Sequence, residues 1–131
     1  MGKAAGNEKI LIVEDHPEVR MLLLMALKEG GRQFLVAENG EDAIAKTRRE
    51  KPDLILLDVM MPGEINGFEV TRILKRDPAT ASCPIITMTA KIHEDDRRLA
   101  LEAGADDYIS KPFDLTELRR KINFLLRPSE A

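Results

Sequence analysis

Five short apolar runs alternate with five longer amphipathic segments along this chain of 131 residues. Short apolar runs bounded by turn residues are typical of buried strands, and apolar residues repeated every three to four positions are typical of helices. Because roughly a dozen or more residues connect each strand to the next, we expect parallel strands in one doubly wound five-stranded α/β sheet, with five helices covering both faces. The predicted strands are Lys9–Val13, Gln33–Ala37, Leu54–Asp58, Pro84–Thr89 and Asp107–Ser110.

The expected helices have recognisable ends in the sequence. Pro17 suits the first turn of the first helix, because a residue there needs no backbone N–H. Asn39-Gly40 indicates a turn before the second helix. Asp114, with Glu117 three positions later, resembles a capping box at the start of the last helix. The predicted helices are residues 17–28, 42–50, 68–75, 94–103 and 115–125.

Length and composition predict a single domain. A chain in which 44% of residues are hydrophobic can bury a core of its own. We expect this domain to span residues 9–127, with a flexible N-terminal tail at 1–8 and a C-terminal tail at 128–131.

Charge and cysteine usage exclude several function classes. The net charge is −3 with both signs interspersed, which argues against direct binding of nucleic acid or an anionic membrane. The basic clusters Arg48-Arg49, Arg97-Arg98 and Arg119-Arg120-Lys121 are interpreted as solvated helix faces. Cys83 is the one cysteine, which excludes a disulfide framework or a thiolate metal site within the chain. Its place before Pro84 predicts packing at the start of a strand. With neither a signal peptide nor a long apolar span, a cytoplasmic location is expected.

Charged or hydroxyl residues follow four of the five predicted strands. In an open parallel sheet the ligand crevice lies outside the carboxyl ends of the strands, so these side chains can meet there. The second strand leaves at Glu38-Asn39-Gly40, which is typical of turn chemistry and fits an edge strand. The four exits are Glu14-Asp15, Asp58, Thr89 and Lys111.

Three carboxylates in one crevice repel one another unless a cation balances them. Lys111 supplies one positive charge, and a divalent ion would supply more. Oxygen ligands without a histidine cluster favour Mg²⁺ over Zn²⁺. His16 is interpreted as a surface residue of the loop. Taken singly, each residue has a structural explanation, such as helix N-terminal charge for Glu14-Asp15 or a solvated lysine.

Four segments together resemble the receiver (phosphoacceptor) domain of two-component response regulators. They are I-L-I-V-E-D, L-I-L-L-D-V-M-M-P-G, M-T-A and D-D-Y-I-S-K-P-F. The resemblance covers the chain from about Glu8 to Leu126. It implies a flavodoxin-like sheet with strand order 2-1-3-4-5, which agrees with the predicted alternation.

The resemblance implies a role for each residue of the crevice. Asp58 matches the aspartate that accepts a phosphoryl group from a partner phosphohistidine, and Lys111 matches the lysine that pairs with the phosphate. Thr89 matches the hydroxyl residue that turns toward the phosphate. Tyr108 matches the aromatic residue whose rotamer follows that hydroxyl, on a face that controls the output partner.

The resemblance also implies a metal site. Asp15 is expected to bind Mg²⁺ directly and Glu14 through water, together with Asp58 and the backbone carbonyl of Met60. Lys91 and Met60 are expected to influence the lifetime of the phosphorylated form. The sequence departs from the family pattern at Glu14, where aspartate is frequent, and at a loop that is one residue longer. That loop places Gly67 nine positions after Asp58 rather than eight.

We therefore expect a signalling switch rather than an enzyme, one that assists only its own phosphorylation and dephosphorylation. Its expected partners are a histidine kinase or a histidine phosphotransfer protein, and a downstream output domain or protein. One alternative is a constitutive interaction module of the same fold. Another is a hydrolase of small phosphate esters, which is disfavoured because Met60 stands where a second aspartate would act as general acid.

Overall fold

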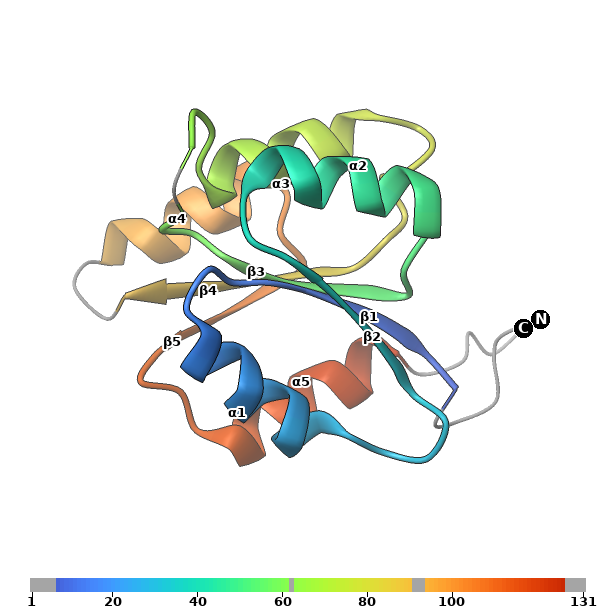
Figure 1. Ribbon diagram of the computed structural model, residues 1–131. Coiled ribbons are helices and arrows are strands. Elements are labelled where there is room, and N and C mark those ends of the chain that lie inside the picture. Colours follow the sequence, from blue (N-terminus) through green and yellow to red (C-terminus); the bar gives the residue numbers. More distant parts are fainter. Residues whose placement is uncertain (1–6, 62, 91–93, 127–131) are drawn as a thin grey trace.

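The computed structural model describes residues 7–61, 63–90 and 94–126. Ten elements alternate strictly along the chain (Figure 1). The strands are β1 Lys9–Val13, β2 Gln33–Ala37, β3 Leu54–Asp58, β4 Ile85–Ala90 and β5 Asp107–Lys111. The helices are α1 Pro17–Leu27, α2 Gly40–Glu50, α3 Gly67–Arg76, α4 Glu94–Ala103 and α5 Leu115–Leu125. The prediction of five strands and five helices is confirmed.

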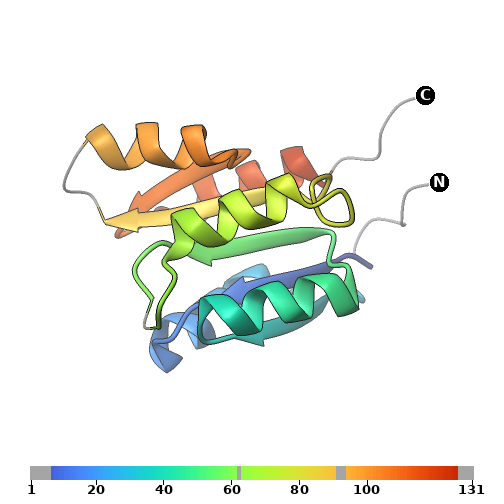
Figure 2. The ribbon, with the colours of Figure 1, turned by 90° about the horizontal axis from the view of Figure 1, so that it is seen from above.

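The sheet has the predicted order, β2-β1-β3-β4-β5, and the four strand pairs are all parallel. Helices α1 and α5 cover one face, and α2, α3 and α4 cover the other (Figure 1). Figure 2 shows the arrowheads of β3 and β4 at the same edge of the sheet. The strand exits therefore gather at one edge, as the sequence predicted.

Each face of the sheet has its own apolar core. Alternate residues of the central strands point to opposite faces, so Ile10 and Leu56 pack with α1 and α5, while Leu11 and Leu57 pack with α2 and α3. Residues Leu54 to Leu57 are fully buried, as a strand covered by helices on both faces requires. The carboxylate of Asp58 stands at the end of this buried strand.

Helices α2 and α3 begin two residues and one residue earlier than predicted, whereas α5 begins at Leu115 as predicted. Asn39, interpreted as part of a turn, is the N-cap of α2 and accepts a hydrogen bond from Asp42 N at 2.8 Å. The helix therefore starts at Gly40, two residues earlier than predicted. At Asp114 the side chain accepts hydrogen bonds from two backbone N–H groups of α5. The complete capping box, with hydrogen bonds in both directions, is formed by Asn66 and Glu69 at the start of α3.

Smaller differences lie at the strand ends. Pro84 precedes β4, because proline has no N–H to donate to a neighbouring strand. Its carbonyl still accepts a hydrogen bond from Ile55 N at 2.9 Å. Ala90 pairs with Lys111, so β4 and β5 each extend one residue beyond the prediction. Lys111 is thus held by the sheet itself.

The predicted tails fall largely outside the described residues, as do Pro62, Lys91 and the last residue of the predicted domain, Arg127. Within the predicted N-terminal tail, Glu8 is described and buried. It pairs with Arg32 at 3.2 Å, and its carbonyl accepts a hydrogen bond from Gln33 N. None of the helices in the described part of the chain is long and apolar enough to cross a membrane.

Candidate functional site

Four strand exits supply the side chains of the candidate site. Glu14 and Asp15 directly follow β1, Asp58 ends β3, Thr89 lies near the end of β4, and Lys111 ends β5. Glu14, Asp58 and Thr89 are buried, whereas Asp15 and Lys111 are half-buried. The structure thus gathers the predicted residues at one edge of the sheet, around the carboxylate of Asp58.

The Asp58 carboxylate is 2% exposed and has a different neighbour at each oxygen. Oδ1 accepts a hydrogen bond from Met60 N at 3.1 Å, and Oδ2 lies 3.2 Å from Lys111 Nζ. Burial and the charge of Glu14 raise the pKa of Asp58 to about 6, and Lys111 moderates this rise. A further cation bound beside Asp58 would favour the charged form of this carboxylate.

Lys111 joins Asp58 to a second buried carboxylate. Lys111 Nζ lies 3.0 Å from Glu14 Oε1, and the Glu14 side chain is fully buried. Burial raises the pKa of Glu14, but hydrogen bonds from His16 and Lys111 outweigh it and lower the pKa overall. For Lys111 burial lowers the pKa, while the two carboxylates outweigh it and raise the pKa overall. The lysine therefore stays charged between two acids.

His16 contacts the acidic pair more closely than its interpretation as a surface loop residue implied. Its ring is 65% exposed, yet Nδ1 lies 3.0 Å from Glu14 Oε2 and 3.3 Å from Asp15 Oδ1. The hydrogen bond with Glu14 raises the pKa of His16. The sequence carried a signal for this contact, because His16 directly follows the two acids.

The acidic cluster offers oxygens to a cation. Ligand atoms of Glu14, Asp15, His16 and Asp58 all lie within 4.8 Å of one another. Asp15 Oδ1 and Asp58 Oδ2 are buried and accept no hydrogen bond from the part of the chain that the structure describes. Each instead has an ion-pair contact, to His16 and Lys111 respectively. Buried carboxylate oxygens of this kind fit a hard divalent ion such as Mg²⁺.

Arg20 supports the acidic pair, and sequence reasoning missed it. From the first turn of α1, its Nη1 donates to the carbonyl of Glu14 at 3.0 Å and to that of Asp15 at 3.3 Å. The same nitrogen lies 3.2 Å from Glu38 Oε1, at the exit of β2. Glu38, interpreted from the sequence only as part of a turn after the second strand, thus helps to hold the loop that carries Glu14 and Asp15. The sequence signal for this role was a basic residue, Arg20, placed about one helical turn after the acids Glu14 and Asp15.

Gly67 fits against the backbone that carries Asp58. A Cβ on Gly67 would lie 2.6 Å from Asp58 O and 2.6 Å from Val59 Cα, far inside van der Waals contact. Gly67 N also donates to Val59 O at 3.0 Å. The first turn of α3 therefore rests directly on the end of β3, despite the additional residue in the preceding loop.

Thr89 and Tyr108 lie on neighbouring strands, β4 and β5. Thr89 is 2% exposed and pairs with Ser110 of β5, two residues beyond Tyr108. Tyr108 is half-buried on β5, which is an edge strand of the sheet. Its ring lies near Arg97 of α4 and Lys121 of α5. Two clusters interpreted as solvated helix faces thus each contribute one cation to this ring.

An apolar hollow of about 410 Å³ opens beside Lys111. Leu22 at its rim is 49% exposed, and the neighbouring Met21 and Met25 of α1 are 63% and 74% exposed. The hollow therefore belongs to an apolar surface next to the candidate site. The residues that line it are Val19, Leu22, Lys111, Pro112 and Phe113.

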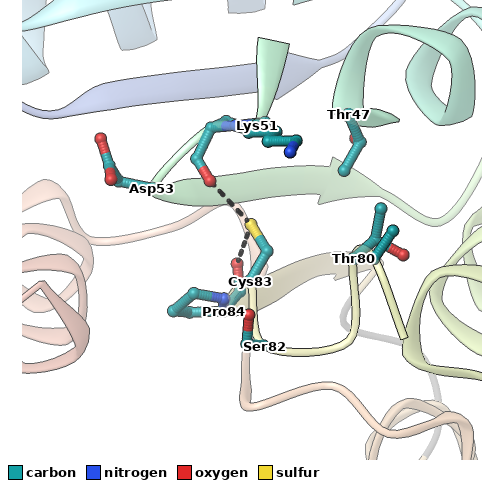
Figure 3. A pocket seen from close by; sticks show the side chains of 9 residues that line it. Thr47, Lys51, Asp53, Thr80, Ser82, Cys83 and Pro84 are labelled. Atoms are coloured by element: carbon teal, nitrogen blue, oxygen red, sulfur yellow. Dashed lines mark hydrogen bonds between the residues drawn. The ribbon is translucent and has the colours of Figure 1, made fainter. Parts of the chain in front are cut away.

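A second hollow, of about 280 Å³, lies near the opposite ends of β3 and β4, where the chain enters the two strands (Figure 3). Cys83 lines it, with Sγ 3.3 Å from the carbonyl oxygen of Pro52. Burial raises the pKa of the Cys83 thiol to about 12, which keeps it protonated at neutral pH. Its packing before β4 is as predicted. None of the site residues named above lines this hollow.

The sequence matches the family description "Response regulator receiver domain" over residues 10–123. The chain belongs to the receiver-domain family of response regulators. The resemblance noted in the sequence is thereby confirmed. The family comprises regulators of two-component signalling.

Curated relatives and solved structures agree with this assignment. The chain is 44% identical to protein PilH of Pseudomonas aeruginosa over 118 residues, covering 90% of this chain and 97% of PilH. It is 48% identical over 121 residues to the phosphate regulon transcriptional regulatory protein PhoB of the same species, covering 92% of this chain but 52% of PhoB. The receiver domain of a signal transduction histidine kinase from Syntrophus aciditrophicus has a similar structure, with 36% identity and a TM-score of 0.84, covering 95% and 96% of the two chains.

Proposed function

We propose that this receiver domain is a phosphorylation-dependent signalling switch in which Asp58 accepts the phosphoryl group. The observation that carries the proposal is the position of Asp58 Oδ2, buried and 3.2 Å from Lys111 Nζ, beside the acidic cluster. Phosphoryl transfer needs an oriented nucleophile, a fixed cation and a divalent ion near the phosphate oxygens. The residues present can supply or hold all three.

In the proposed reaction the nitrogen–phosphorus bond of a partner phosphohistidine breaks and an oxygen–phosphorus bond to Asp58 forms. The histidine ring nitrogen keeps the electron pair of the broken bond. Lys111, already charged between Asp58 and Glu14, pairs with the transferred group. The hydrogen bond from Met60 N to Oδ1 holds the carboxylate in position. The domain acts here on itself alone, which is why we do not class it as an enzyme.

The acidic cluster would hold Mg²⁺, with Asp15 and Asp58 as direct ligands and Glu14 acting through water. The Met60 carbonyl is proposed to complete the protein's share of the ligands. Bound Mg²⁺ would neutralise charge on the phosphate oxygens during transfer. The buried oxygens of Asp15 and Asp58, which accept no hydrogen bond from the described residues, support this assignment.

The phosphoryl group on Asp58 carries about 1.5 to 2 negative charges beside Thr89 and Lys111. We propose that Thr89 turns its hydroxyl toward the phosphate and that the ring of Tyr108 follows. This coupling is supported by the pairing of β4, which carries Thr89, with β5, which carries Tyr108. Because the two strands are neighbours, a movement of Thr89 can displace residues of β5. The surface around Tyr108 would then control a downstream output domain or protein.

The proposed donor is a sensor histidine kinase or a histidine phosphotransfer protein. The apolar surface of Leu22 and the hollow beside Lys111 support a protein partner at this edge, because exposed apolar patches next to a functional site are typical of interfaces. A donor docked there would present its phosphohistidine next to Asp58.

Intact-mass spectrometry tests the proposal. After incubation with acetyl phosphate and Mg²⁺, we expect a species heavier by roughly 80 Da, the mass of one phosphoryl group. The Asp58→Asn variant should stay unmodified, and Asp53→Asn, at the other end of the same strand, should be phosphorylated like the wild type. An unmodified wild type would instead favour the constitutive interaction module.

A further inference from the structure

Two cations from opposite layers of the molecule approach the ring of Tyr108. Arg97 Cζ lies 5.7 Å from the ring centroid, and Lys121 Nζ lies 5.5 Å from it. Arg97 comes from α4 on one face of the sheet, and Lys121 from α5 on the other, with the edge strand β5 between them (Figure 1). A cation within about 6 Å of an aromatic centroid is attracted by the π system.

We propose that Arg97 and Lys121 are positioning residues for Tyr108. They hold its ring in its half-buried position between α4 and α5, and so set how much of the protein has the ring in its shifted position before phosphorylation. This inference rests on the proposed switch, in which the ring follows Thr89. It adds Arg97 and Lys121 to the residues of the proposed switch. Both belong to basic clusters that were interpreted from the sequence as solvated helix faces.

The contacts of Lys121 show how this cation is itself held. Its Nζ lies 2.9 Å from Asp107 Oδ1 and 3.8 Å from Glu117 Oε1. Asp107 Oδ1 also accepts a hydrogen bond from Tyr108 N at 2.8 Å. The backbone of Tyr108 and the cation over its ring thus share one carboxylate. Lys121 thus connects α5 both to β5 and to the ring of Tyr108.

Arg97 is the simpler of the two cations to test, because Lys121 also forms ion pairs with Asp107 and Glu117. The neighbouring Arg98 donates to Glu102 within α4 at 3.1 Å, so it serves as a control of equal charge on the same helix. An Arg97→Ala substitution removes the ring contact and leaves the Asp107–Lys121 pair in place. Arg97→Lys retains a cation at the same position of the helix.

The composition supplies the probe, because the chain has one tyrosine and no tryptophan. Its intrinsic fluorescence therefore reports on Tyr108 alone, and quenching by neutral acrylamide measures the exposure of the ring. The experiment compares wild-type, Arg97→Ala, Arg97→Lys, Arg98→Ala and Lys121→Ala proteins, each before and after treatment with acetyl phosphate and Mg²⁺.

If the cations hold the ring in place, Arg97→Ala and Lys121→Ala will shift the quenching constant of the untreated protein at least halfway toward the value of the phosphorylated wild type. Arg97→Lys and Arg98→Ala will stay at the wild-type value. Quenching of untreated Arg97→Ala equal to that of the wild type would overturn the inference. Quenching of untreated Lys121→Ala equal to that of the wild type would overturn the role of Lys121.

The two proposals fail in distinguishable ways. Intact mass, measured on the same samples, reports whether phosphorylation took place. Without a mass increase the proposed phosphorylation fails, and the comparison of untreated Arg97→Ala with Arg97→Lys still tests the ring contact. With a mass increase but unchanged quenching in untreated Arg97→Ala, the proposed phosphorylation stands and the positioning role is wrong.

Discussion

At the scale of single residues, the candidate site is a balance of buried charges. Asp58 and Glu14 repel each other, and Lys111 lies within 3.2 Å of both. The balance is incomplete, since the pKa of Asp58 remains raised to about 6. Removing one of the two negative charges should therefore stabilise the folded protein in the absence of a divalent ion.

We predict that Asp58→Asn raises the free energy of unfolding by about 1–2 kcal/mol at pH 7 in metal-free buffer, after allowance for solvent screening. The folded-state pKa of about 6 exceeds the ordinary value of 3.8, so the folded wild type binds a proton more tightly than the unfolded chain. The wild type consequently loses stability as pH rises from about 4 to about 6. Urea unfolding of both proteins across this range measures the difference.

The advantage of Asp58→Asn should disappear below about pH 4, where Asp58 is protonated in both states. Glu64→Gln, in the exposed part of the loop before α3, is the matched control and should have little effect at any pH. A destabilised Asp58→Asn at pH 7 would contradict the charge balance described here.

At the scale of elements, the start of α3 fixes the end of β3. The capping box of Asn66 and Glu69 ends the loop, and Gly67 places the helix directly on the carbonyl of Asp58. The longer loop noted in the sequence is thus accommodated before Asn66 rather than at the site. Ile65 of this loop packs against the core shared by α2 and α3.

Gly67→Ala should destabilise the fold by roughly 1–3 kcal/mol, because its Cβ would lie 2.6 Å from backbone atoms that cannot yield without moving β3. It should also slow phosphorylation by acetyl phosphate, since Asp58 moves with that backbone. Thermal unfolding and time-resolved intact mass measure the two effects. Gly31→Ala, in the exposed turn before β2, should affect neither. Wild-type kinetics in Gly67→Ala would contradict the role of this contact.

At the scale of the whole molecule, the alternation of apolar runs and amphipathic segments predicted a doubly wound parallel sheet and the edge where the candidate residues gather, whereas the strand order came from the family resemblance. This succeeded because parallel strands bring their carboxyl ends together regardless of the details of packing. Arg20 and the contacts of His16 were not predicted, since they depend on how side chains fold back over a loop. Asn39 was assigned to a turn because the same residue type caps helices and starts turns.

The apolar surface of α1 also belongs to this scale, because it concerns a second protein. Leu22→Glu should slow phosphoryl transfer at least tenfold from a phosphorylated histidine phosphotransfer protein that is active on the wild type. The charge would lie in the hollow beside Lys111, where a partner is proposed to dock. Transfer from acetyl phosphate should be unchanged, because this small donor needs no docking surface.

Ile73→Glu, on the exposed side of α3, is the matched control and should leave both rates unchanged. Equal loss of both rates in Leu22→Glu would indicate damage to the site itself. Wild-type rates with both donors would show that the partner docks elsewhere.

The central claim is that Asp58 carries the phosphoryl group, and chemical mapping of the modified residue tests it most directly. Borohydride reduces an aspartyl phosphate to homoserine, which peptide fragmentation locates along the chain. After acetyl phosphate, Mg²⁺ and borohydride, homoserine should replace Asp58 and no other acidic residue. Homoserine at another aspartate, with Asp58 intact, would contradict the account.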